Sequence, residues 1–328
     1  MKKNNIIKLI LIIVVVALLV VLPLVIKNDS TINLVILVLL YILLASSWNI
    51  LGGYTGQTNL GHAAFFGVGS LTTRLLWVNG VPFLLSFLAG GVVAVILALI
   101  IGAPAFKLRG VYFAIGTLAL AQMLNLTVGN ILPEMSYNPD LANYQLLPRY
   151  YLFLGLTLIT ILTAAILVKS RIGLGMMAVR EGEDAAESLG ISALKHKLIA
   201  LSISAFFAGM AGAAFAYYHV SFYYYMPFGS EWTFDPMMMA YIGGTGTIIG
   251  PIIGAVFFVL LKQLLVWNVG EYHLIIFGTL FILIVLFLPG GLVEIWQKFR
   301  TFLTKKTKRR KKVLLKATIQ NEDGIQRE

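Results

Sequence analysis

The sequence predicts an all-α polytopic membrane protein with about ten transmembrane or re-entrant helical segments. Hydrophobic residues make up 59% of the chain and charged residues only 12%, whereas soluble domains carry roughly 25% charged residues. The apolar residues are gathered in repeated runs near the roughly 20 residues that a helix needs to cross a bilayer. Glycine-rich stretches interrupt two of these runs, so we expect some segments to be re-entrant.

The predicted spans follow from these runs in chain order. Residues 1–8 are basic and look like the start of a signal peptide, but the next apolar run is too long and no cleavage site follows it. We expect spans at residues 9–26, 32–51, 52–77, 82–102, 111–128, 150–168 and 198–218, one or two more within 234–267, and a last one at 272–288. The domains would be a basic N-terminus (1–8), a transmembrane domain (9–291) and a basic, partly disordered tail (292–328).

Basic residues predict the orientation, because cytoplasmic loops are enriched in Lys and Arg. Five such residues lie between 169 and 197, whereas the loop 130–149 has one, which places that loop outside. The net charge of +11 comes largely from the tail, where ten Lys or Arg residues lie between 298 and 316. A basic cluster after a span is typical of a cytoplasmic anchor on anionic lipid, rather than of nucleic-acid binding. Both termini are therefore expected in the cytoplasm.

Residues 234–267 leave two topologies open. Two crossings, broken at the Gly-Pro stretch 243–254, put the tail inside, whereas one kinked span would put it outside. The first choice agrees with the basic tail.

Few residues could carry chemistry. The spans contain hardly an ionisable side chain apart from Arg74, Lys262 and His62, which argues against an ion-coupled transporter, a pump or a membrane enzyme. Arg74 is expected near the outer face, with its side chain reaching the interface. The chain has no cysteine, its four histidines are scattered, and it has no Walker A sequence. We therefore expect no metal, no cofactor and no catalysis on this chain.

Two polar, glycine-rich interruptions, residues 52–70 and 243–254, are loosely similar. Paired interruptions of this kind indicate a central pathway in transporters built from repeats, although glycine is also common in packed membrane helices. The polar residues that could line such a path are neutral, which suits a neutral or zwitterionic solute. These candidates are Gln57, Thr58, Asn59, His62, Thr117, Gln122, Asn125, Thr245 and Thr247. For any single one, a hydrogen bond to a neighbouring helix is the simpler explanation.

The polar segment, residues 170–197, is the longest charged run between hydrophobic segments. Residues 181–190 place acidic side chains before Gly190, which favours a short helix with acids at its N-terminus and glycine at its end. A solvated connector is the alternative.

Within that stretch, Asp184-Ala-Ala-Glu-Ser-Leu-Gly190 resembles the EAA-x-x-x-G coupling loop of ABC importer permeases, with Asp in place of the first Glu. The motifs at 52–70, 108–122, 175–191, 197–216 and 243–255 are similar to those of the branched-chain amino acid permease family, in its LivM branch. The resemblance covers residues 46–291. It implies that Asp184, Ala185, Ala186 and Gly190 couple the chain to an ATPase subunit.

The resemblance also implies partners and a substrate. The partners would be a LivH-like sister permease, two ATP-binding subunits that carry ATP and Mg, an extracytoplasmic solute-binding protein, and lipid of a bacterial plasma membrane. The substrates would be leucine, isoleucine and valine, moved by alternating access. A same-family permease for urea or short amides and an ion-coupled secondary transporter remain alternatives, and the pairing of permeases as hetero- or homodimer stays open.

Overall fold

The chain is seen in a computed structural model that describes residues 2–26 and 28–269, and beyond them 275–276, 278–279, 282 and 290–294. Apart from these isolated positions, the predicted last span (272–288) and the basic tail lie outside the described residues.

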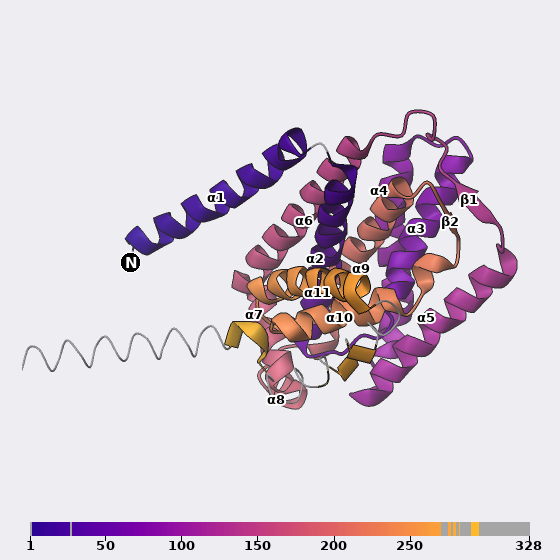
Figure 1. Cartoon of the computed structure of the whole chain (residues 1–328). Helices are drawn as coiled ribbons and strands as arrows, with labels where there is room; N and C mark the ends of the chain where they lie inside the picture. Colours follow the sequence, from indigo (N-terminus) through magenta and orange to yellow (C-terminus); the bar gives the residue numbers. More distant parts are fainter. Residues whose placement is uncertain are drawn as a thin grey trace, which may run out of the picture.

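The described part is built almost entirely of helices, which confirms the predicted fold class (Figure 1). The helices are α1 (Lys2–Val25), α2 (Asp29–Thr55), α3 (His62–Val78), α4 (Phe83–Ala105), α5 (Val111–Ile131), α6 (Leu146–Lys169), α7 (Arg171–Glu181), α8 (Glu183–Ser188), α9 (Ala193–Tyr218), the short 3-10 helix η1 (Met226–Phe228), α10 (Glu231–Gly243) and α11 (Ile249–Val269). Two three-residue strands, β1 (Met135–Tyr137) and β2 (Ser221–Tyr223), pair antiparallel with Ser136 opposite Phe222.

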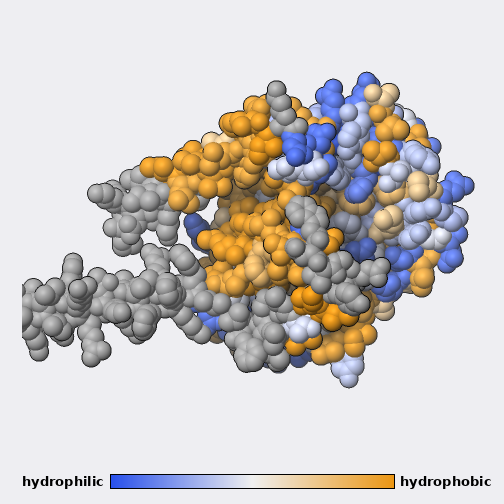
Figure 2. All heavy atoms as spheres, in the orientation of Figure 1, coloured by the Kyte–Doolittle hydropathy of each residue, from blue (hydrophilic) through white to orange (hydrophobic). Residues whose placement is uncertain are grey.

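Six of the described helices are long and apolar enough to cross a membrane: α2, α4, α5, α6, α9 and α11. Helices α3 and α10 have 17 and 13 residues, and both adjoin the predicted interruptions. With α1, the described part has nine such helical segments, which agrees with the prediction of about ten. Figure 2 shows hydrophobic side chains on the coloured part of α1 and on the exposed side of the α10–α11 hairpin, as expected for surfaces that face lipid or another membrane subunit.

Helix α9 lies at the centre of the bundle, where small residues allow close packing. A Cβ on Gly212 would lie 1.9 Å from the carbonyl oxygen of Phe66, and one on Gly69 would lie 2.1 Å from that of Gly209. Helices α3 and α9 therefore touch through their backbones, which is how membrane helices associate where no hydrophobic force drives them together.

Helix α1 stands apart from the body and is held mainly by α6 (Figure 1). Pro23 lies inside α1 and has no N–H, so the carbonyl of Leu19 lacks its helical donor. The hydroxyl of Tyr150 donates to that carbonyl at 2.6 Å. The predicted N-terminus and first span thus form one helix from Lys2.

The first interruption lies between α2 and α3. Helix α2 ends at Gly56, which adopts the left-handed conformation (φ +72°) that favours glycine at a helix end. Helix α3 begins at His62, whose ring contacts Ser47, about two turns before the end of α2. The chain therefore turns back into the bundle before α3 starts, as predicted for a re-entrant break.

The second interruption separates α10 from α11, so residues 234–267 form two helices rather than one kinked span. With 13 residues, α10 reaches only about 20 Å, which is less than the ~30 Å bilayer core. The two helices pack as a hairpin against α2, where Met239, Ile242 and Phe258 surround Tyr41. Lys262 pairs with Asp235 at 3.1 Å, an acid that the sequence analysis left out of its intramembrane charges.

The prediction that the side chain of Arg74 reaches the interface was wrong. Its side chain is fully buried and donates to the carbonyl of His219 at 2.8 Å, instead of reaching the interface. The carbonyl groups at the end of a helix lack helical donors, so they can accept hydrogen bonds from a guanidinium. The sequence does not show which helix ends lie near Arg74.

Candidate functional site

The polar segment forms two short helices and the start of α9. The hydroxyl of Ser170 accepts from the N–H of Gly173 to cap α7, and that of Ser192 accepts from the N–H of Lys195 to cap α9. Between them α8 begins with Glu183 and Asp184 and ends before Gly190, which has φ +81°. The predicted helix is present, because acids suit a helix N-terminus and glycine its left-handed end.

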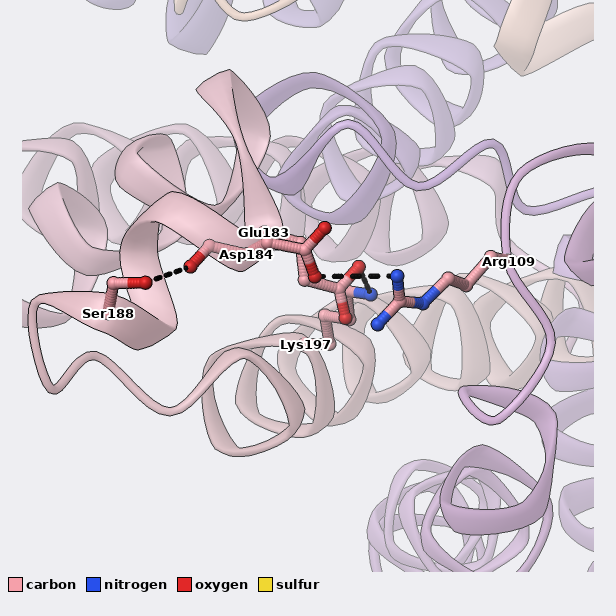
Figure 3. A network of polar contacts seen from close by, with 5 residues as sticks. All are labelled: Arg109, Glu183, Asp184, Ser188 and Lys197. Atoms are coloured by element: carbon pink, nitrogen blue, oxygen red, sulfur yellow. Dashed lines mark hydrogen bonds and ion pairs between the residues drawn. The ribbon is translucent and has the colours of Figure 1, made fainter.

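Two ion pairs attach α8 to the rest of the chain (Figure 3). Lys197 at the start of α9 is 1% exposed, and its Nζ lies 2.5 Å from Oε2 of Glu183. Arg109, in the α4–α5 loop, lies 3.4 Å from Asp184, with both side chains largely exposed. An exposed ion pair contributes little to stability, whereas a buried lysine is costly unless its charge is paired. The Lys197–Glu183 pair is therefore the firm attachment.

The four residues implied in coupling divide between two sides of α8. Ala186 is buried and packs against Val179 of α7 and Ala193 of α9. Asp184, Ala185 and Gly190 are exposed, and the neighbouring Leu189 is 81% exposed. Helix α8 is thus anchored to the bundle on one side. On the other side, α8 and the Leu189 that follows it expose acidic and apolar side chains, which is a surface that another protein could bind.

Helix α7 connects the polar segment to both interruptions. Nη1 of Arg180 donates to the carbonyl of Gly53 at 2.6 Å, in the last turn of α2. One helical turn earlier, the side chain of Asn49 donates to the carbonyl of Thr247 and accepts from the N–H of Gly246. Sequence reasoning missed Arg180 and Asn49 as site residues, since a basic loop residue and a lone amide in an apolar run carry no signal of their partners.

Three of the path candidates meet at the start of α3. The N–H of Leu60 donates to Oγ1 of Thr117 at 3.1 Å, that of Gly61 to Oδ1 of Asn59 at 2.8 Å, and the ring of His62 lies 3.0 Å from the Ser47 hydroxyl. Asn59 and Thr117 line a cavity of about 10 Å³, enough for one water. The residues are therefore tightly packed at this point, which we call the α3 constriction (Asn59–Gly61 and Thr117).

Gln57 and Thr58 line a wider cavity of about 300 Å³, together with Val111 and Ala114 of α5. Four of the path candidates thus lie within residues 57–62, and Thr117 of α5 contacts this stretch through the N–H of Leu60.

The other candidates lie elsewhere. Thr247 accepts from the N–H of Gly250 and so caps α11, and Thr245 is half-buried in the same turn, near Asn49. Asn125 donates to the carbonyl of Tyr225. Gln122 is half-buried on α5, and no hydrogen bond joins it to the remaining candidates in the described part of the chain.

Among the described residues, no three His, Cys, Asp or Glu side chains come together in a way that could hold a metal ion.

Long apolar helices, two interruptions within the bundle and an exposed helix at one end define a multi-pass membrane transport protein. The comparison with known families makes this more specific. A family model described as the permease component of the branched-chain amino acid transport system matches residues 30–285. The chain belongs to this family, which confirms the resemblance seen in its motifs.

Individual relatives agree with the family. The chain is 26% identical, over 302 residues, to the high-affinity branched-chain amino acid transport system permease protein LivM of Escherichia coli; the match covers 81% of this chain and 70% of that relative. It is 23% identical, over 313 residues, to a probable LivM of Methanocaldococcus jannaschii, covering 77% and 90% of the two chains. No solved structure matches the chain.

Proposed function

We propose that this chain is a membrane-spanning subunit of an ABC importer for leucine, isoleucine and valine, working by alternating access. ATP and Mg would bind on two partner ATPase subunits, and a LivH-like sister permease and an extracytoplasmic binding protein would complete the assembly in a bacterial plasma membrane. In this arrangement α7, α8 and both termini lie in the cytoplasm. The observation that carries the proposal is the exposed helix α8, anchored through Ala186 and Lys197.

The contacts of the polar segment suggest how motion would pass inward. A partner that moves α8 would act on α9 through Glu183 and Lys197, and α9 packs against α2, α3 and α4. The same movement would act through Arg180 on the last turn of α2, where the first interruption begins. Asp184, Ala185 and Gly190 would lie in the contact with the partner.

The solute path is proposed to run through the α3 constriction. Gln57 and Thr58 would form its cytoplasmic mouth, and Asn59, His62 and Thr117 its closed section. The proposal is supported by the position of these residues at the break between α2 and α3, because irregular backbone at membrane depth is expected to line a cavity. Thr245 and Thr247 would act by positioning the second interruption, and Gln122 stays a candidate on α5.

The test is leucine-stimulated ATPase activity and leucine uptake by the assembled complex in liposomes. Leu189→Glu places a charge on the exposed side of α8 and should abolish both activities while the isolated chain stays folded. Ala186→Glu should also abolish both activities, because a charge in this buried contact displaces α8 from α7 and α9. Leu141→Glu, at an exposed leucine (48%) in the loop that precedes α6, is the control for adding a surface charge.

Three results would contradict the proposal. Unchanged ATPase activity in Leu189→Glu and Ala186→Glu would remove α8 from the coupling. Leucine uptake by this chain alone in ATP-free liposomes would indicate an ion-coupled transporter, and uptake of urea or acetamide but not leucine would indicate another solute.

A further inference from the structure

Two arginines are buried at the C-terminal end of α9, at the opposite end of the bundle from α7 and α8. Arg74 of α3 donates to the carbonyl of His219 at 2.8 Å. Arg149 of α6 donates through Nε to the carbonyl of Tyr217 at 3.0 Å. Both are at most 1% exposed. The negative end of the helix dipole favours a cation, which explains why the two arginines lie at the end of α9. It does not explain why several of their N–H groups lack an acceptor.

The charge of these arginines is not neutralised by an acid. In the part of the chain that the structure describes, neither guanidinium forms an ion pair. Nε and Nη1 of Arg74 and Nη2 of Arg149 have no hydrogen-bond partner among the described residues. Aromatic faces cover them instead, with Phe222 4.7 Å from Arg74 and Tyr144 3.8 Å from Arg149. Because dipoles and rings compensate a full charge only in part, a positive potential extends beyond these side chains.

Two adjoining cavities lie directly beyond the arginines, and we call them together the vestibule. The smaller, of about 270 Å³, is lined by Asn33, Tyr144, Tyr218, His219, Val220 and Ser221. Tyr144 separates it from Arg149, and Arg74 holds the backbone of His219. The larger, of about 640 Å³, shares Asn33, Tyr218 and His219 with it. Such a volume lies in the ~300–1,000 Å³ range of small-molecule sites.

The lining of the vestibule is polar at one end and apolar along one wall. The hydroxyl of Tyr218 donates to Oδ1 of Asn33 at 2.8 Å, which orients the amide so that its Nδ2 can donate to a ligand. Burial, followed by the charge of Arg74, lowers the pKa of His219 to about 4, so its ring is neutral at pH 7. In the larger cavity, Leu34 and Leu37 form the apolar wall.

We propose that the vestibule is a solute-receiving site that binds an aliphatic α-amino acid, with its carboxylate at the Asn33–His219 end and its side chain against Leu34 and Leu37. The positive potential of Arg74 and Arg149 favours the carboxylate without direct contact, and the neutral amide and imidazole supply donors. The site rests on the proposed import function and names the place where this chain first holds the solute.

The test is the substitution Asn33→Asp in the fully assembled complex, with L-leucine as the probe. Aspartate keeps the acceptor for Tyr218 but removes the Nδ2 donor and adds a negative charge opposite the carboxylate. The apparent KM for leucine uptake should rise by roughly tenfold or more, with a much smaller effect on the maximal rate of uptake. Asn130→Asp adds the same charge to an exposed asparagine at the end of α5 and should leave KM unchanged.

A second variant tests the volume. Leu37→Trp fills the larger cavity and should raise KM for leucine more than KM for alanine, which has the smaller side chain. Equal KM values for leucine in Asn33→Asp, Asn130→Asp and the unmodified complex would overturn the site. A rise in KM that is matched by weaker binding of the solute-binding protein to the complex would also overturn it. If the unmodified complex takes up no leucine at all, the import function itself fails, and the two failures are thereby distinguished.

Discussion

Single residues with unusual environments determine much of how this chain is held together. Lys197 appears in the sequence as one of several loop cations, yet it is buried and its partner is Glu183, 14 residues earlier. Arg74 and Arg149 are similar cases at the other end of the bundle. A buried charge is costly unless it is paired or hydrogen-bonded, so each of these contacts is expected to tolerate substitution poorly.

Glu183→Gln tests this expectation at α8. The variant leaves Lys197 buried beside a neutral amide, and we expect the free energy of unfolding to fall by about 1–3 kcal/mol, less than for a fully buried pair because Glu183 is partly exposed. Unfolding of the detergent-solubilised chain measures it. Glu187→Gln, on the exposed side of the same helix, is the control; equal effects for the two variants would show that the pair contributes nothing specific.

Among the elements, the positions of the two interruptions were the easiest to predict from the sequence. The contacts that surround them were the hardest. The glycine-rich stretches indicated where the helices break, because polar backbone at membrane depth must be buried or line a cavity. Nothing in those stretches indicated that α7 reaches them through Arg180, or that α10 and α11 are joined by an ion pair within the bundle. Such contacts depend on which helices pack together.

The α10–α11 hairpin offers a double-mutant cycle. Lys262→Met leaves Asp235, which also accepts from the Tyr41 hydroxyl, without its cation. We expect that variant to lose about 1–3 kcal/mol of stability and the double variant Asp235→Leu with Lys262→Met to lose less, because removing both charges avoids an unpaired one. Thermal unfolding of the four chains gives the coupling energy, and purely additive losses would contradict the interpretation.

For the whole molecule, the α3 constriction and the vestibule lie at different levels along α9. The vestibule is at the N-terminal end of α2 and the C-terminal end of α9, whereas the constriction lies toward the opposite ends of both. On the proposed path, a solute received in the vestibule passes the constriction, so closing the constriction more firmly should slow transport without affecting assembly.

Gly61→Ala is the corresponding test. The backbone of Gly61 allows alanine (φ −103°), but the added Cβ would lie 2.6 Å from the carbonyl oxygen of Thr117. We expect α5 to be displaced at a cost of about 1–3 kcal/mol, and the rate of leucine uptake to change severalfold. Gly116→Ala on α5 meets only the end of the Leu108 side chain and is the control. Identical uptake rates for the two variants would remove the constriction from the path.

The sequence by itself determined the all-α membrane fold, the family, the two interruptions and the helix at residues 181–190. Each of these depends on properties carried within a short stretch: the hydropathy and length of a span, glycine at a break, acids and glycine at helix ends. Only the tertiary structure decided that Lys197 is buried against Glu183, that Arg74 and Arg149 cap α9, that Asn49 holds the second interruption, and that Gln122 lies apart from the other path candidates. Those facts depend on which of many similarly apolar helices lie side by side, and in a membrane that choice is made by close packing and by scattered polar contacts between residues far apart in the chain.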